Sequence, residues 1–412
     1  MSGTLFAIAW RNVVRNKRRS LITILSVAIG LLALLFIWGF NDGSHNNMMA
    51  NFRALMTGSF QVHQTDFFDH PKLETNISDQ TVLLAAMESV GIDAWTTRLS
   101  SFALSAGEET STGMILLGMD PIREPLVTTL NEKISVGRFL EPGDEYTAVI
   151  GAKGAAKLGL GLGDEIILLT QDRRGTLTAD KFDIVGLIKS GDPIIDQAMV
   201  MVPLESAQEL LVMEGRITDF VAQVPESELH QIAAELRMIL EPEDLELLEW
   251  EEINPIIRQI VNLDNGFMYI FISIVVLIVI SGVVNTVLVS MLQRTREFGV
   301  LMAMGTSTGA IGAVVLIEAI FLGLLGTAVG TAGGLGLVAW FARTGIDLSA
   351  MMDPELVEIM GEFYLDTTIF AEIDTNHLLI TVLGLLAATI VSAFYPALRA
   401  MQLEPVEAIR HI

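Results

Sequence analysis

The chain has 412 residues, a formal net charge of −24 at pH 7 and no cysteine. This acidic balance argues against a nucleic-acid partner, because phosphate binding needs clustered Lys and Arg. The lack of cysteine excludes disulfides, thiolate metal sites and a lipidated N-terminal cysteine. A saline habitat and a cationic ligand are both compatible with the acidity.

Apolar residues gather in four blocks, each long enough to cross a bilayer as a helix, which needs about 20 residues. The blocks are 21–40, 267–292, 311–341 and 377–396. One such block could be a buried core helix, but four indicate a membrane protein. We therefore expect a polytopic α-helical membrane protein with four transmembrane helices. A large α+β extracytoplasmic domain, residues 41–266, is inserted between helices 1 and 2. The first block lacks a signal-cleavage site and is expected to remain as an anchor.

Basic residues predict the orientation. Five precede the first block with no acid among them, and the short segment 342–376 is acidic. The positive-inside rule places both termini and residues 293–310 in the cytoplasm, and 342–376 outside, for a protein of the inner membrane. The tail 397–412 is then cytoplasmic. The five basic residues are Arg11, Arg15, Lys17, Arg18 and Arg19.

Residues 1–20 suit an amphipathic basic helix at the cytoplasmic surface. Its apolar side chains are expected on lipid and its basic ones near anionic headgroups. The alternative is a plain run of basic residues that only fixes topology. The apolar set is Leu5, Ile8, Ala9, Trp10 and Val13.

The segment 41–266 has the alternation and turns of an α+β domain. Stalk helices are expected at both of its ends, because 46–55 lacks a helix breaker and 250–265 is interrupted only by Pro255. Strands are expected at 58–64, 114–120, 146–151, 182–189, 198–204 and 220–224. Helices are expected at 81–90, 205–213 and 228–240, and a helix, glycine turn and strand at 151–171.

Sequence motifs for catalysis are missing. The Gly-rich stretch 151–163 is not a phosphate loop, because no G-x-x-x-x-G-K-[ST] occurs in the chain. The six histidines form no H-x-x-x-H pair and no H-E-x-x-H motif. Adjacent acids such as Asp144 and Glu145 are better explained as solvated faces. We expect a non-catalytic chain with no catalytic, cofactor or metal site.

Small residues recur four apart in two of the apolar blocks, which allows close helix approach. They are explained equally well by tight packing within one subunit and by a moving or dimeric seam. The set is Gly282 and Thr286 in one block and Gly326, Gly330 and Gly334 in the other.

Two polar residues, Asn285 and Glu318, lie within apolar blocks. An intramembrane acid is costly and is usually functional or paired. Glu318 is expected near the cytoplasmic end of its helix, in a structural pair with Arg294 or Arg296. The other helices hold no further acids, which disfavours a proton relay.

Three passages carry a family resemblance: AWRNVVRNKRRSLITILSVAIG at 9–30, NTVLVSMLQRTREFGVLMAMGTS at 285–307 with IEA at 317–319, and FYPALRAMQLEPVEAIR at 394–410. Together they resemble the FtsX-like permeases of ABC transporters, the superfamily of MacB and the LolC/LolE lipoprotein-releasing permeases. The passage VIGAKGAAKLGLGLGD at 149–164 is similar to that superfamily's porter-type domain.

The resemblance implies two permeases, identical or related, each above a separate ATPase that binds ATP and Mg. A coupling helix in 293–310 would dock on the ATPase, and the passage around Pro396, Arg399, Pro405 and Arg410 would supply another cytoplasmic element. By position, the docking residues are Arg296, Glu297, Phe298, Met302, Met304, Gly305, Thr306 and Ser307.

The leading hypothesis is an ABC permease that transmits ATP-driven motion to its outer domain and extracts or releases a lipoprotein or another amphipathic substrate. One alternative is MacB-like efflux, although MacB normally carries its ATPase on the same chain. Another is an FtsX-like signalling permease that activates a cell-wall hydrolase, which the long 41–266 segment disfavours. A non-transport membrane adaptor is the weakest candidate.

Overall fold

A computed structural model describes residues 2–106, 110–349, 352–362 and 367–403. The chain divides into two compact units. The helical unit comprises residues 1–46, 261–348 and 368–412, and the α/β unit comprises residues 47–260 and 349–367.

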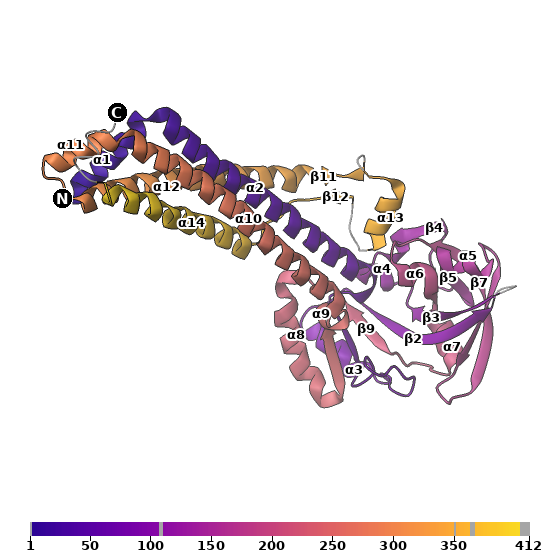
Figure 1. Cartoon of the computed structure of the whole chain (residues 1–412). Helices are drawn as coiled ribbons and strands as arrows, with labels where there is room; N and C mark the ends of the chain where they lie inside the picture. Colours follow the sequence, from indigo (N-terminus) through magenta and orange to yellow (C-terminus); the bar gives the residue numbers. More distant parts are fainter. Residues whose placement is uncertain (1, 107–109, 350–351, 363–366, 404–412) are drawn as a thin grey trace. The chain divides into compact units, whose positions relative to one another are not determined.

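The helical unit is a bundle whose four long helices lie side by side (Figure 1). Four helices in the described chain are long and apolar enough to cross a membrane, which confirms the predicted fold class. Its helices are α1 Ser2–Arg15, α2 Lys17–Phe52, α10 Pro255–Gln293, α11 Thr295–Ala303, α12 Thr308–Thr344 and α14 Thr375–Met401.

The helices begin and end beyond the apolar blocks because polar residues cap them. The Ser307 hydroxyl accepts from the Ala310 N–H at 3.3 Å, so α12 starts before residue 311. The Asp374 carboxylate accepts from the Asn376 N–H at 2.7 Å and starts α14. Segment 342–376 is not a plain loop. It contains α13, Pro354–Glu362, and the antiparallel strands β11, Ile346–Asp347, and β12, Thr368–Ile369.

The small residues of α12 serve packing within this chain. A Cβ built on Gly330 would lie 2.8 Å from the Ala28 carbonyl oxygen of α2. One built on Gly326 would lie 2.7 Å from Val27, and one on Gly334 would lie 2.9 Å from Leu35. By contrast, a Cβ on Gly282 of α10 would meet no atom within 4 Å in the described chain. The same spacing therefore has different roles on the two helices.

Helix α1 packs on the protein and not only on lipid. Ala9 and Val13, expected on lipid, are buried, while the rings of Phe6 and Trp10 contact Phe321 of α12 edge-on, at 5.9 and 5.6 Å. The expectation for Ala9 and Val13 was wrong because α12 covers that face.

The α/β unit contains one mixed sheet of ten strands in the order β10-β1-β9-β2-β3-β8-β5-β7-β4, with β6 pairing β2 and β7. Pairs β3–β8 and β5–β7 are parallel, and the others are antiparallel. The strands are β1 Phe60–Gln64, β2 Trp95–Ala106, β3 Ser111–Met119, β4 Ile134–Gly137, β5 Thr147–Gly151, β6 Glu165–Gln171, β7 Leu177–Ile188, β8 Met199–Pro203, β9 Asp219–Ala222 and β10 Leu245–Glu249.

Helices of this unit lie between the strands along the chain. They are α3 Thr81–Ser89, α4 Glu124–Val127, α5 Ala152–Leu158, α6 Pro193–Ala198, α7 Leu204–Leu211, α8 Glu226–Leu240 and α9 Trp250–Ile253. The predicted elements are present, including the helix, glycine turn and strand at 151–171. The prediction missed β4, β10 and β2, and β2 lies in the middle of the sheet and pairs with three other strands.

We expect Gly330→Ala to destabilise the bundle by about 1–3 kcal/mol, because the added methyl would press against the backbone of α2. Gly282→Ala is the matched control and should be neutral or slightly stabilising, since its methyl enters open space. Thermal unfolding of the full chain in detergent measures both. Equal unfolding midpoints for the two variants would contradict this packing.

Candidate functional site

The segment between α10 and α12 forms a helix, α11, as predicted for the coupling element. Gly305 closes the turn after it with φ +95°, a conformation that favours glycine. Helix α11 lies at the same end of the bundle as α1 (Figure 1). The predicted coupling segment is therefore a short helix held between two turns.

The structure separates the predicted docking residues into two groups. Phe298 and Met302 are buried in the core of the bundle, so they anchor α11 and do not face outward. Thr306 is half-buried. The exposed members are Arg296, Glu297, Met304, Gly305 and Ser307.

Two further exposed apolar residues of α11, Val300 and Leu301, were missed by the sequence analysis. Their side chains are 46% and 38% exposed, and Met304 is 71% exposed. Large apolar side chains exposed on a short helix at the end of the bundle make this face a candidate interaction surface. Helical spacing would have separated them from buried Phe298 and Met302.

Ion pairs connect α11 to the rest of the bundle. Arg294 Nη1 donates to Glu318 Oε2 of α12 at 2.9 Å, which is one of the two pairs expected for Glu318. Arg294 Nε donates to Glu297 at 3.2 Å, and Glu297 lies 3.6 Å from Arg15 of α1. Glu318 and Arg294 are largely buried, so this pair fixes the position of the turn more firmly than the exposed Arg15–Glu297 contact.

Helices α2 and α10 are joined beside this network. Arg19 Nη1 donates to the Ser290 hydroxyl at 2.6 Å, and Arg19 Nη2 donates to Gln293. Asn285, one turn further into the bilayer, is exposed. The structure thus brings Glu318 into a network and leaves Asn285 on the surface of α10.

The opposite end of the bundle contains a cluster of hydrogen-bonded polar residues that the sequence analysis missed. The Asp42 carboxylate of α2 accepts from His377 Nδ1 at 2.9 Å and from the Asp374 N–H at 2.9 Å. The imidazole stacks on the Trp38 ring at 3.7 Å. These contacts join α2 to the start of α14. Histidine and aspartate are 335 residues apart, so spacing gave no signal.

The second predicted cytoplasmic element lies partly outside the described residues. Pro396 lies inside α14, and Arg399 lies over the Tyr395 ring at 5.7 Å. Pro405 and Arg410 are beyond the described chain.

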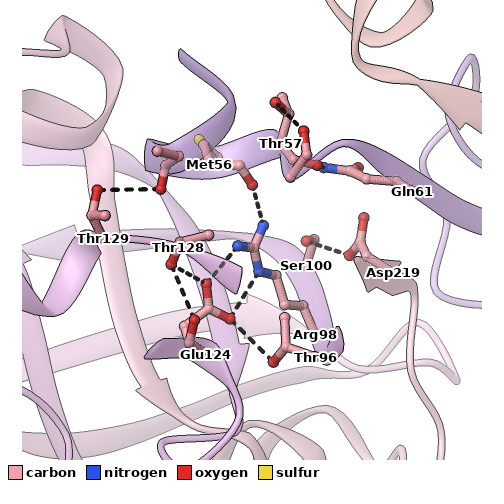
Figure 2. Close-up of polar contacts among 12 residues, drawn as sticks. Met56, Thr57, Gln61, Thr96, Arg98, Ser100, Glu124, Thr128, Thr129 and Asp219 are labelled. Atoms are coloured by element: carbon pink, nitrogen blue, oxygen red, sulfur yellow. Dashed lines mark hydrogen bonds and ion pairs between the residues drawn. The ribbon is translucent and has the colours of Figure 1, made fainter. Parts of the chain in front are cut away.

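In the α/β unit, a π-helical turn, η1 Arg53–Thr57, is fastened through its carbonyl groups. The Ala54 oxygen accepts from the Thr129 N–H at 2.7 Å, and the Met56 oxygen accepts from Arg98 Nη1 at 2.6 Å (Figure 2). The Arg53 oxygen accepts from the Gly58 N–H at 3.0 Å. The terminal carbonyls of a helix lack intrahelical partners. Here, side chains and backbone of the sheet unit supply them.

A buried ion pair supports this junction. Arg98 of β2 and Glu124 of α4 are 3% and 1% exposed, and Arg98 Nη2 donates to Glu124 Oε1 at 2.5 Å. Hydroxyls of Thr128 and Thr96 also donate to the carboxylate, at 2.8 and 3.3 Å (Figure 2). The pair is fully hydrogen-bonded, which a buried charge requires.

These features define a class: a four-helix membrane protein with an inserted α/β domain and a short helix presented at one end of the bundle. Residues 20–239 match the MacB-like periplasmic core domain, and residues 269–405 match the FtsX-like permease C-terminal model. The chain belongs to this family of FtsX-like, MacB-like ABC transporter permeases.

Several relatives align over nearly the whole chain. The lipoprotein-releasing system transmembrane protein LolC of Neisseria meningitidis is 22% identical, with 96% of each chain covered. An uncharacterised ABC transporter permease of Methanocaldococcus jannaschii is 23% identical, with 98% and 97% covered. The macrolide export ATP-binding/permease protein MacB of N. meningitidis is 24% identical, and the match covers 98% of this chain but 60% of MacB.

We expect Arg98→Met or Glu124→Gln to destabilise the α/β unit by about 3–5 kcal/mol, because each leaves the other partner buried and uncompensated. The double variant Arg98→Met/Glu124→Gln should cost less than the sum of the two single changes. Unfolding of the full chain, followed by tryptophan fluorescence, measures this. Lys181→Met is the control, because its pair with Glu165 is exposed and screened by solvent and should contribute little to stability. Strictly additive costs would show that the pair is not coupled.

Proposed function

We propose that this chain transmits ATP-driven motion of a separate ATPase to its inserted domain, and thereby extracts or releases a lipoprotein or another amphipathic substrate from the inner membrane. Both termini and α11 would lie in the cytoplasm, and residues 41–266 outside. The observation that carries the proposal is the exposed apolar face of α11, held to the membrane helices by Arg294 and Glu318.

An outside energy source is required because the chain has no phosphate-loop motif. The MacB relative is named as both ATP-binding protein and permease, and the match leaves 40% of it uncovered. ATP and Mg would therefore be bound by a partner ATPase, in two copies per complex. This chain would be non-catalytic.

The docking surface would be Val300, Leu301 and Met304, with Arg296 and Ser307 beside them. Buried Phe298 and Met302 would transmit force into the bundle. Helix α2, Lys17–Phe52, leads directly into the turn η1 and would be the covalent path by which the motion reaches the inserted domain. Within the α/β unit, η1 is bonded to Arg98 of β2 and to Thr129.

The substrate is proposed from the relatives. LolC is named as part of a lipoprotein-releasing system, and its match covers 96% of both chains. That favours an acylated protein over a macrolide, for which the MacB match is less complete. MacB-like efflux and FtsX-like activation of a cell-wall hydrolase remain the alternatives that the experiment below separates.

The variant Leu301→Asp/Met304→Asp should lose co-purification of the partner ATPase, because two charges replace the apolar contact. ATP-dependent release of acylated lipoprotein from spheroplasts should fall with it, by about tenfold or more, as for loss of interface hot spots. Leu177→Asp, in a residue 73% exposed on the α/β unit, is the control and should retain both.

The two readouts separate the parts of the proposal. Intact ATPase binding by Leu301→Asp/Met304→Asp would reject α11 as the docking helix. ATPase binding without lipoprotein release by the unmodified chain would reject the substrate. Activation of a soluble cell-wall hydrolase in its place would establish the signalling alternative.

A second permease, identical or paralogous, would pack on α10. Of the most apolar stretch of α10, 11% is buried in this chain, against 50% for α12. Because the chain has no cysteine, Ile278→Cys gives a single reporter on that face. Oxidation should yield a disulfide-linked dimer with a second copy, whereas Leu383→Cys on α14 should not. A monomer with both variants would reject a homodimer seam at α10.

A further inference from the structure

A cavity of about 670 Å³ opens between the start of α2 and the last turns of α10. Its lining is basic at one end and apolar at the other, with Arg15, Lys17 and Arg18 at the first and Ile22 and Val289 at the second. This volume lies within the range of small-molecule sites, about 300–1,000 Å³. The cavity belongs wholly to the helical unit.

The basic end has unneutralised charge. Arg19 is held by Ser290 and Gln293 and forms the back wall. Arg15 faces Glu297 at 3.6 Å, with both side chains more than half exposed. Lys17 and Arg18 are exposed and have no ion-pair partner among the described residues. The cavity therefore favours an anion at the level where α2 enters the bilayer.

The apolar end contains two polar side chains, Asn285 and Thr286. Asn285 is exposed on α10, two turns from Gln293, at a depth where an unpaired amide is costly. Thr286 does not satisfy it, because the Thr286 hydroxyl donates to the Gly282 carbonyl at 2.8 Å. Asn285 lines the same cavity as the basic residues. A ligand with an acceptor at this depth would satisfy the amide.

Only one ligand class matches this order of groups. An anionic phospholipid has a phosphate at the interface, ester carbonyls below it and acyl chains deeper. We propose that the cavity is a binding site for one anionic phospholipid. Its phosphate contacts Lys17 and Arg18, an ester carbonyl accepts from the Asn285 amide, and its chains lie along Ile22 and Val289. Basic pockets between membrane helices bind such headgroups in other proteins. The inference does not rest on the proposed function.

Native mass spectrometry of the full chain, titrated with phosphatidylglycerol or phosphatidylcholine, tests the proposal. Phosphatidylglycerol should bind at least about tenfold more tightly. Lys17→Gln/Arg18→Gln should weaken phosphatidylglycerol by about 25-fold, since each charge near the surface is worth about fivefold. It should weaken phosphatidylcholine much less, because the choline cation offsets the charge of its phosphate. Asn285→Leu should weaken both lipids by about fivefold, because both carry the ester carbonyl.

Lys133→Gln/Lys189→Gln, which removes two exposed lysines of the α/β unit, is the matched control and should behave as the unmodified chain. Equal binding of the two lipids, unaffected by Lys17→Gln/Arg18→Gln, would overturn the headgroup site. Unchanged binding by Asn285→Leu would overturn the assigned depth. Displacement of phosphatidylglycerol by millimolar glycerol 1-phosphate would show a soluble-phosphate site and overturn the lipid.

Discussion

The ion pair between Arg294 and Glu318 fixes the position of the turn between α10 and α11 at one end of the bundle. Both side chains are largely buried, so separating them would leave a charge without a partner in apolar surroundings. Arg294 stands at the turn between α10 and α11, and Glu318 stands in α12. The pair therefore fixes where α11 leaves the membrane helices. Arg294 also lies over the Phe298 ring at 5.0 Å, which joins the charge to the buried anchor of α11.

The α/β unit also contains a buried ion pair, Arg98–Glu124, and there the arginine supplies a hydrogen bond to a helical carbonyl group. A helix that ends against a domain presents carbonyl groups that need donors. Arg98 supplies one donor to Met56, and Thr129 supplies one to Ala54. Arg98 can be buried only because Glu124 neutralises it. Gly58 ends the turn with φ +62°, and a Cβ there would lie 2.7 Å from the Ala222 carbonyl oxygen, so only glycine fits.

The membrane helices and most strands were predictable because each depends on local patterns: apolar length for the helices and alternation for the strands. Strand β2 was not, because its buried residues include Thr96, Thr97 and Arg98, which are polar in sequence. Thr96 and Arg98 are buried with Glu124 as a hydrogen-bond partner, and that contact is not visible in the sequence. Which apolar residues of α11 are exposed could not be predicted from the sequence either. Phe298 and Val300 look equally apolar, and only packing against the bundle distinguishes them. The Asp42–His377 hydrogen bond was not predictable, because it joins two helices that are far apart in the sequence.

Small residues with the same spacing are packed against another helix on α12 but face open space at Gly282 on α10. The two helices therefore differ in how closely the rest of the bundle holds them. Gly330 lies against the backbone of α2, so α2 and α12 are closely packed at this point. Helix α10 is joined to α2 at one end through Arg19, and most of its apolar surface is not covered by this chain. Under the proposed function, a force on α11 would enter through Arg294 at the end of α10 and through Glu318 in α12. The Arg294–Glu318 pair would then act both on α12, which is packed against α2, and on the less covered helix α10.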